Sequence, residues 1–192
     1  ELDALAAADA LVALAGHRRQ AAWAAAGAAP LATQLDLLAG VAVTETRPEL
    51  AAPSEGENLV ADYASTGLTL GRHPLALLRE RLAAQRFLSA AGLRAAAHCQ
   101  LARMAGIVTG RQRPGTATGV VFVTLEDESG LANIVVHADL VERQRRELLG
   151  ARMLGVFGQV QREGEVVHLV AKRFVDLTHL LGSLPTASRD FH

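Results

Sequence analysis

The chain has 192 residues, of which half are hydrophobic, and its formal net charge at pH 7 is −1. This length suits one or two domains with a core, and the near-zero charge excludes a general electrostatic attraction to nucleic acid. The single cysteine, Cys99, excludes an internal disulfide. Neither a secretory signal nor an apolar run of roughly 18 residues is present, so we expect a cytoplasmic chain with no membrane contact.

The first 39 residues are predicted to be helical. The sequence begins at Glu1 without an initiator methionine, and its first residues already have the pattern of a helix interior, so we expect a fragment of a longer protein. Apolar residues from Leu5 to Leu14 lead to Gly16, and the stretch 17–26 precedes a second glycine. Each glycine is placed as a helix stop, which predicts two short helices joined as a hairpin.

The next two segments differ in character. Residues 40–57 hold prolines, glycines and several acids with no sustained period, which is typical of a linker. Helical patterning resumes over residues 58–98, which we predict to be a helical connector. It contains one helix at Leu59–Ser65 and another at His73–Ala84, in which Pro74 occupies the first turn and Leu75, Leu78 and Leu82 share one face.

Strand patterns dominate residues 99–178. Val121, Val123 and Leu125 alternate with Phe122 and Thr124, so the two sets point to opposite faces of a strand. A polar turn ending at residue 130 then precedes a second apolar run, which predicts a hairpin. Five strands with a helix between the third and fourth is the order of an OB-fold barrel. The expected strands are 101–112, 118–127, 130–136, 151–162 and 165–175, with the helix at about 138–148 and a tail at 179–192.

The predicted fold class is therefore α+β, with a helical N-terminal region followed by a five-stranded OB-fold barrel. Such barrels bind single strands through aromatic platforms for the bases and a basic groove for the phosphates. The residues that fit these roles lie on or beside the first four strands, and we predict that they converge on one side of the barrel. They are Arg103, Arg111, Arg113, Phe122, Thr124, Asn133 and Arg152.

Several of these assignments have a structural alternative. Phe122 and Phe157 also suit the core of a small barrel, where strand aromatics commonly pack. Arg113 begins a loop between the first two strands, 113–116, which in this fold often contacts nucleic acid. The arginines of the helix after the third strand alternate with glutamates, which is typical of a solvated face, and we assign them no role.

Six segments of the chain resemble the C-terminal part of bacterial error-prone DNA polymerases, the translesion relatives of the polymerase III alpha subunit. The resemblance covers nearly the whole chain and includes the end of a helix-hairpin-helix region. The segments are GHRRQAAWAA (16–25), ENLVADYASTGLTLGRHPLALLRERL (57–82), AGIVTGRQRPGTATGVVFVTLEDESG (105–130), LVERQRRELLG (140–150), QREGEVVHLVA (161–171) and LPTASRDFH (184–192).

The resemblance implies that the parent is a DNA-directed DNA polymerase, a nucleotidyltransferase of damage-induced repair. In that family the active site lies in an upstream palm, where carboxylates hold the metal ions, expected to be Mg²⁺. We therefore expect no catalytic residue, cofactor or metal site in this fragment. His137 stands where the family pattern leads us to expect an aromatic residue, typically Trp, so no stacking role is assigned there.

The family also implies protein partners. Error-prone polymerases act with a catalytically defective Y-family-like protein and a RecA-like accessory factor, which are mutasome subunits. The segment Gln34-Leu35-Asp36-Leu37-Leu38 resembles the QLxLF consensus by which bacterial polymerases bind the sliding clamp. In such motifs the glutamine bonds polar groups at a pocket rim and the apolar side chains fill the pocket. A buried face of an ordinary helix is the alternative, because short leucine-rich stretches arise easily by chance.

Three other functions are weighed. The barrel surface can instead be a docking platform for mutasome subunits or the clamp that never touches DNA, which the near-neutral charge favours. A replicative alpha subunit is the less favoured expectation, because the sequence stops at His192, before the further clamp-loader-binding domain that we would expect of such a subunit. An independent enzyme is the weakest class: no phosphate loop, nucleophile elbow or dinucleotide fingerprint is present, and His98-Cys99 has no second ligand pair at zinc spacing.

Overall fold

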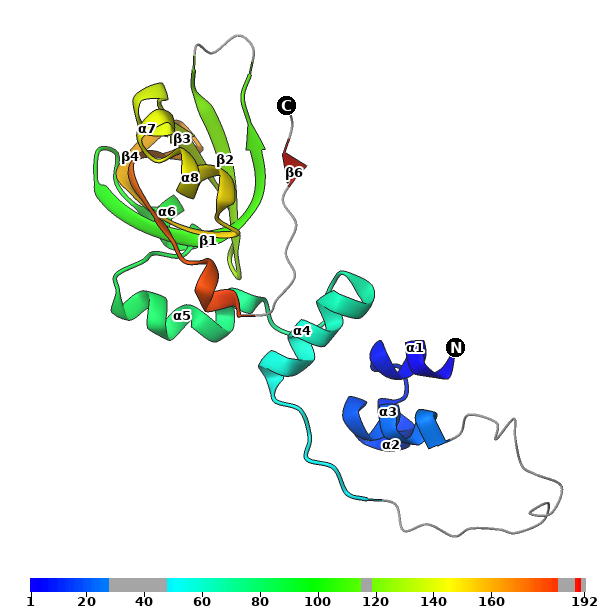
Figure 1. Ribbon diagram of the computed structural model, residues 1–192. Helices are drawn as coiled ribbons and strands as arrows, with labels where there is room; N and C mark the ends of the chain where they lie inside the picture. Colours follow the sequence, from blue (N-terminus) through cyan, green and yellow to red (C-terminus); the bar gives the residue numbers. More distant parts are fainter. Residues whose placement is uncertain (28–47, 115–118, 183–188, 191–192) are drawn as a thin grey trace, which may run out of the picture. The chain divides into compact units, whose positions relative to one another are not determined.

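The computed structural model describes residues 1–27, 48–114, 119–182 and 189–190. The chain forms two compact units, Glu1–Thr69 and Leu70–His192 (Figure 1). The boundary between them lies inside the segment 58–98 that we expected to be one connector. Of the helices in the described ranges, none is both long and apolar enough to cross a lipid bilayer.

The first unit is a small helical domain. Asp9 adopts a φ of 60°, so the first expected helix is interrupted, whereas Gly16 separates two helices as expected. The core between the first and third helices consists of Ala6, Ala21 and Ala25, whose small side chains permit a close approach. The helices are α1 (Leu2–Ala7), α2 (Val12–Ala15), α3 (Arg18–Gly27) and α4 (Glu55–Thr66).

Helix α4 begins inside the range that the sequence assigned to the linker. Ser54 caps it with a complete capping box: its hydroxyl accepts from the Glu57 N–H, and the Glu57 carboxylate accepts from the Ser54 N–H. The chain before the cap is held to α3, because the Gln20 amide donates to the Pro48 carbonyl at 3.0 Å and accepts from the Leu50 N–H at 3.1 Å. The described end of the expected linker is therefore ordered by specific bonds.

A buried arginine joins α3 to α4. Arg18 donates to the Asn58 carbonyl at 3.0 Å and pairs with the carboxylate of Asp62, which also accepts from the Thr69 hydroxyl at 2.6 Å. Burial raises the pKa of Asp62, but the hydrogen bonds from Arg18 and Thr69 outweigh it and lower the pKa below its usual range. Asp62 therefore stays charged and balances the buried guanidinium.

The second unit contains a closed five-stranded barrel, as the sequence predicted. The sheet order is β2-β3-β5-β4-β1, and β1 also pairs with β2, which closes the ring. The long β1 achieves this by pairing with β4 through its first half and with β2 through its second half (Figure 1). The strands are β1 (Leu101–Gln112), β2 (Val121–Asp127), β3 (Gly130–Val136), β4 (Met153–Glu163), β5 (Val166–Asp176) and the short β6 (Arg189–Asp190), which pairs parallel with β1.

The alternation in the sequence sets the two faces of the barrel. Val121, Val123 and Leu125 are buried in the interior, while Phe122 and Thr124 face outward. Close packing between strands also needs glycine. A Cβ atom at position 106 would lie 2.8 Å from the Cβ of Leu125, so only glycine permits this approach of β1 to β2.

In the part of the chain that the structure describes, five short helical segments accompany the barrel. The expected helix at 138–148 is present but broken at Gln144, whose amide donates to the Phe174 carbonyl at 3.1 Å and accepts from the Phe174 N–H at 2.7 Å. A helix that the sequence analysis missed contributes Ala90 and Leu93 to the barrel core. The segments are α5 (Pro74–Ala84), α6 (Ala90–Ala95), α7 (Ala138–Arg143), α8 (Arg145–Gly150) and the 3-10 helix η2 (Thr178–Leu181).

Candidate nucleic-acid interface

Three of the predicted contact residues lie side by side on the outer surface of the barrel. Thr124 on β2 is directly opposite Asn133 on β3, which in turn pairs with His168 on β5. Phe122, one position along the same face of β2, is opposite Val135. Residues directly opposite in neighbouring strands point to the same side of a sheet. We call this surface the β2–β3 face; it consists of Phe122, Thr124, Asn133, Val135 and His168.

The β2–β3 face offers an aromatic ring beside hydrogen-bonding groups. Phe122 and Thr124 are half-buried, and Asn133 is exposed. The His168 Nδ1 atom is buried and has no hydrogen-bond partner among the described residues. Arg113 is exposed and directly follows Gln112, which pairs with Phe122. Residues 115–118 of the adjoining loop lie outside the described ranges.

Arg111 lies elsewhere. It pairs with Val123, so its side chain points toward the interior side of the sheet, and only 7% of the residue is exposed. Its guanidinium donates to the carbonyls of Leu148 and Ala151 at 2.7 and 2.5 Å, at the end of α8. The charge therefore satisfies the open carbonyls of a helix terminus and is not presented to a phosphate.

Arg152 also lies outside the β2–β3 face. It is half-buried just before β4, and its N–H donates to the Thr178 hydroxyl at 2.9 Å. Its carbonyl accepts from the Val108 N–H at 2.9 Å. These main-chain bonds place Arg152 at the junction of β1, β4 and η2.

Arg103 belongs to a second surface. It pairs with Phe157 across β1 and β4, and its guanidinium lies 5.2 Å from the centre of the Phe157 ring. Arg173 on β5 lies closer, at 4.0 Å from the same ring centre. Phe87 contacts this ring edge-on, with 5.6 Å between the two centres. Phe157 is thus a half-buried ring that contacts two guanidinium groups, an arrangement that the sequence did not predict.

A hollow of about 460 Å³ lies beside this ring, and we call it the Phe157 pocket. Three cationic side chains line it, and Arg173 adds a fourth charge at the ring. All four are exposed, and in the described part of the chain none of them forms an ion pair with a carboxylate. The lining residues are Arg86, Leu88, Gln100, Leu101, Ala102, Arg103, Phe157, Gly158 and Lys172.

Sequence reasoning missed Arg86, Lys172 and Arg173. One available signal is that Lys172, the only lysine of the chain, is followed directly by an arginine on a predicted strand. Strict alternation would send these two side chains to opposite faces. The pairing of β4 with β5 shifts register between Phe157 and Gly158, so β5 has one extra residue there and both cations are exposed.

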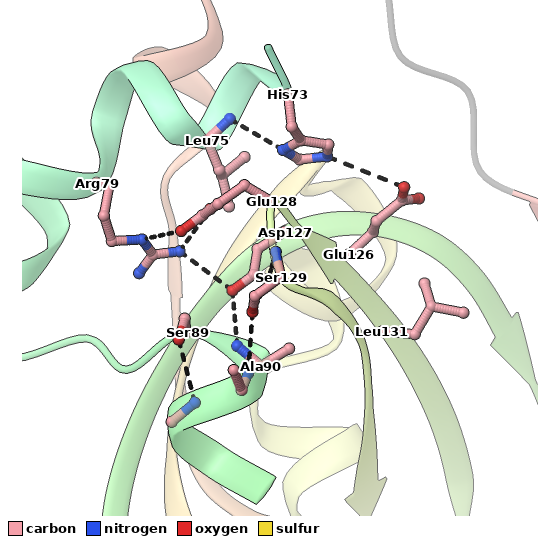
Figure 2. Close-up of polar contacts among 12 residues, drawn as sticks. His73, Leu75, Arg79, Ser89, Ala90, Glu126, Asp127, Glu128, Ser129 and Leu131 are labelled. Carbon is pink, nitrogen blue, oxygen red and sulfur yellow. Dashed lines mark hydrogen bonds and ion pairs between the residues drawn. The ribbon is translucent and has the colours of Figure 1, made fainter.

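The polar turn between β2 and β3 has a structural role that the sequence did not reveal. Figure 2 shows the Arg79 side chain of α5 extending to this turn, where it donates to Glu128 at 2.5 and 2.9 Å and to Asp127 at 3.1 Å. Asp127 is buried and also accepts from the Ala90 N–H at 2.7 Å and from the Ser129 hydroxyl at 2.7 Å. We call these residues, Arg79, Ala90, Asp127, Glu128 and Ser129, the Asp127 latch.

The latch fixes α5 and α6 to the barrel. The Ser129 hydroxyl accepts from the Ala91 N–H at 2.9 Å, and Arg94 donates to the Ser129 carbonyl at 2.9 Å. His73, at the start of α5, accepts from the Leu75 N–H through Nδ1, and its Nε2 lies 4.0 Å from the Glu126 carboxylate (Figure 2). Burial lowers the pKa of His73 below its ordinary value, although the neighbouring acids raise it.

Other predicted sites are placed as follows. The clamp-like residues Gln34, Leu35, Leu37 and Leu38 lie outside the described ranges. In the described ranges, no group of three or more His, Cys, Asp or Glu residues is arranged to hold a metal ion. The His98 ring accepts from the Arg162 N–H at 3.1 Å, and His137 is an exposed residue at the start of α7.

Comparison with known proteins identifies the fold of the barrel and relatives of the chain. Residues 102–177 match the tRNA_anti-codon family, described as an OB-fold nucleic acid binding domain. Error-prone DNA polymerases from Dechloromonas aromatica (strain RCB) and Azoarcus sp. (strain BH72) are each 67% identical to the chain over all 192 residues. One from Bordetella parapertussis is 58% identical over an alignment of 197 residues that covers the whole chain.

The chain spans 18% of the length of these three relatives. Among solved structures, asparaginyl-tRNA synthetase from Pyrococcus horikoshii is 18% identical with a TM-score of 0.41, covering 47% of this chain and 23% of that one. The 67% identity to two of these polymerases over the whole of this chain confirms the resemblance that the sequence motifs indicated. The chain is therefore a segment of the error-prone DNA polymerase family that contains an OB-fold nucleic-acid-binding domain.

Proposed function

We propose that the OB-fold domain binds single-stranded DNA through the β2–β3 face and presents it to the catalytic part of an error-prone DNA polymerase. The observation that carries the proposal is the placement of Phe122, Thr124 and Asn133 as neighbours on one outward face. A ring beside hydrogen-bonding side chains allows a base to stack and its edge to bond. Arg113, exposed next to Phe122, supplies a charge for a phosphate.

The parent protein in this proposal is a cytoplasmic DNA-directed DNA polymerase that copies damaged template. Its nucleotidyl transfer and its Mg²⁺ ions belong to other parts of the protein, and this segment contributes binding and positioning. Mutasome subunits and the sliding clamp are its proposed protein partners, the clamp through Gln34–Leu38.

The test is binding of fluorescent oligo-dT to the 192-residue chain, followed by anisotropy at two salt concentrations. Changing Phe122 to Ala removes the platform and is expected to weaken binding by roughly 5- to 150-fold, since a stacked base contributes about 1 to 3 kcal/mol. The matched control is Leu149→Ala, which removes a similarly sized, exposed apolar side chain from α8. Equal affinities for the two variants, with thermal melts showing both folded, would refute the proposed face.

A second candidate is a protein-docking role for the same face. It is favoured by Glu126, an acid on the outward side of β2, and by Leu131, which is opposite it on β3 and 55% exposed. Both features suit a protein partner better than a phosphate backbone. DNA binding that relies on phosphates must weaken as salt rises, whereas an apolar protein contact need not. Absence of any salt-sensitive oligo-dT binding, together with retained association of a mutasome subunit, selects this candidate.

A further inference from the structure

We propose that the Phe157 pocket is a second subsite for single-stranded DNA, in which a base stacks on the Arg173 guanidinium and the adjoining phosphates contact Lys172 and Arg86. This inference rests on the proposed function for the identity of the ligand. The pocket itself lies away from the β2–β3 face, at the first half of β1 and the facing parts of β4 and β5.

The geometry of the ring supports a stacking role. Arg173 lies 4.0 Å from the centre of the Phe157 ring, which is within the range of a cation over an aromatic face. Arg173 is itself exposed, so a ligand can reach it at the ring. Bases in single strands stack on guanidinium planes as well as on aromatic rings. The Phe157–Arg173 pair is therefore a preformed platform that has an exposed cation as its outer layer.

The charges of the pocket support a phosphate ligand. Arg86, Arg103, Lys172 and Arg173 gather at one hollow, although the formal charge of the whole chain is −1. Among the described residues, no acid lines the hollow. Contact with a phosphate is electrostatically favourable only where cationic side chains are in local excess, because the total charge of the chain gives no attraction. Within the described ranges these cations have no acidic partner, and more of them gather here than at the β2–β3 face, where Arg113 adjoins one end and Glu126 lies at the other.

The two surfaces are connected along β5. His168 belongs to the β2–β3 face, and Lys172 lines the pocket four residues later on the same strand. A strand advances about 3.3 Å per residue, so the two positions are roughly 13 Å apart. An OB-fold typically covers about 4 to 16 nucleotides, which is long enough for one DNA strand to contact both surfaces.

The experiment compares two double variants of the 192-residue chain by anisotropy with dT4 and dT16. Lys172→Ala with Arg173→Ala removes two pocket charges and the outer layer of the platform. Arg143→Ala with Arg145→Ala removes two exposed charges from α7 and α8 and is the matched control. For dT16 we expect the pocket variant to lose roughly tenfold in affinity and to show a salt slope smaller by about 0.7, because only Lys172 of this pair contacts a phosphate, and we expect the control to resemble wild type.

A third variant tests the flat stack apart from the charge. Arg173→Lys keeps the cation but loses the planar group, so the salt slope should stay near wild type while affinity for dT16 falls severalfold. The dT4 probe is at the lower limit of an OB-fold site, so its affinity should respond to Phe122→Ala more than to the pocket variant.

The outcomes separate the two proposals. If Phe122→Ala weakens dT16 binding but the pocket double variant equals its control, the pocket inference fails and the proposed function stands. If the pocket variant weakens binding and Phe122→Ala does not, the β2–β3 face fails and the pocket stands. If wild type binds no oligo-dT, both fail. Binding of poly-glutamate that depends on the pocket, with no pocket effect on dT16, assigns the pocket to an acidic protein and overturns the inference.

Discussion

The Asp127 latch and the Phe157 pocket both place arginines on the surface of the same unit, but they leave the charges in opposite conditions. In the latch, Arg79 donates to Asp127 and Glu128, so its charge is neutralised within the fold. In the pocket, Arg103 and Arg173 lie against an aromatic ring and have no acidic partner among the described residues. The same side chain is structural where carboxylates surround it and available for binding where they do not.

The two groups of arginines also differ in how much their interactions contribute to the free energy of folding. Removing one partner of a buried ion pair costs about 3 to 5 kcal/mol, because the other charge loses its compensation. An exposed cation over a ring contributes only about 0.5 to 1 kcal/mol. Substitutions in the latch should therefore act mainly on folding, and substitutions in the pocket mainly on ligand affinity.

The largest expected effect is that of Asp127→Asn. It replaces a buried carboxylate that accepts from Arg79, Ala90 and Ser129, so we expect a loss of about 3 kcal/mol in the free energy of unfolding. Urea unfolding followed by circular dichroism measures it. The matched control is Asp139→Asn, whose exposed pair with Arg143 should contribute about 0.5 kcal/mol or less. Equal losses for the two variants would remove the contrast between the latch and an ordinary surface pair.

A smaller loss is expected from Gly158→Ala, at the register shift beside the pocket. The added Cβ would lie 2.3 Å from the Val170 carbonyl oxygen, a backbone atom that cannot turn aside. Overpacking of this kind costs about 1 to 3 kcal/mol, measurable as a lower midpoint of thermal unfolding. As a control, Gly56→Ala adds the same methyl group to α4, where nothing lies within 4 Å, and should be neutral or stabilising. A Gly158→Ala midpoint at or above that of wild type would contradict the tight approach of β4 to β5.

Arg173→Ala should change stability by about 1 kcal/mol or less, because only an exposed cation over a ring is lost. Arg79→Ala, an equal truncation in the latch, should cost severalfold more. Chemical denaturation of the two variants side by side gives the comparison directly. A large loss for Arg173→Ala would mean that the pocket arginines hold the fold and are not reserved for a ligand.

The smallest expected effect concerns pH and His73. Because burial lowers its pKa in the folded state, the unfolded chain binds the proton more readily, so stability falls as pH drops through the ordinary value of 6.5. Protonation would also take Nδ1 away from the Leu75 N–H. His73→Asn keeps a capping acceptor that does not titrate. Melting temperatures between pH 7.5 and 5.5 should therefore fall less for this variant than for wild type; parallel falls would exclude His73 as the titrating group.

Short-range patterns in the sequence predicted the barrel well. Alternation over Val121–Leu125 and the turn before Leu131 define a hairpin without reference to the rest of the chain, and both were confirmed. The face formed by Phe122, Thr124 and Asn133 follows from the same alternation plus the hairpin register. Features that depend on neighbours in the sequence can be predicted in this way.

Features that depend on register shifts or on partners distant in the sequence could not be predicted from the sequence. Arg103 and Arg111 are an even number of residues apart, so plain alternation places them on one face. The irregularity between Val108 and Gly110 shifts the register and turns Arg111 toward the interior side. The division of the expected connector was hidden for another reason: Arg79 and Asp127, whose pairing ties α5 to the barrel, are 48 residues apart.

The position of the latch bears on how readily the β2–β3 face accepts a strand. The turn that Arg79 and Ala90 hold is the one that joins β2 to β3, so the two strands carrying Phe122, Thr124 and Asn133 are braced at their shared end. A braced hairpin has fewer conformations to lose when a ligand orders it, which lowers the entropic cost of association. If the β2–β3 face binds DNA as proposed, loosening the turn should therefore weaken binding from a distance, through preorganisation, without altering any of the proposed contact residues.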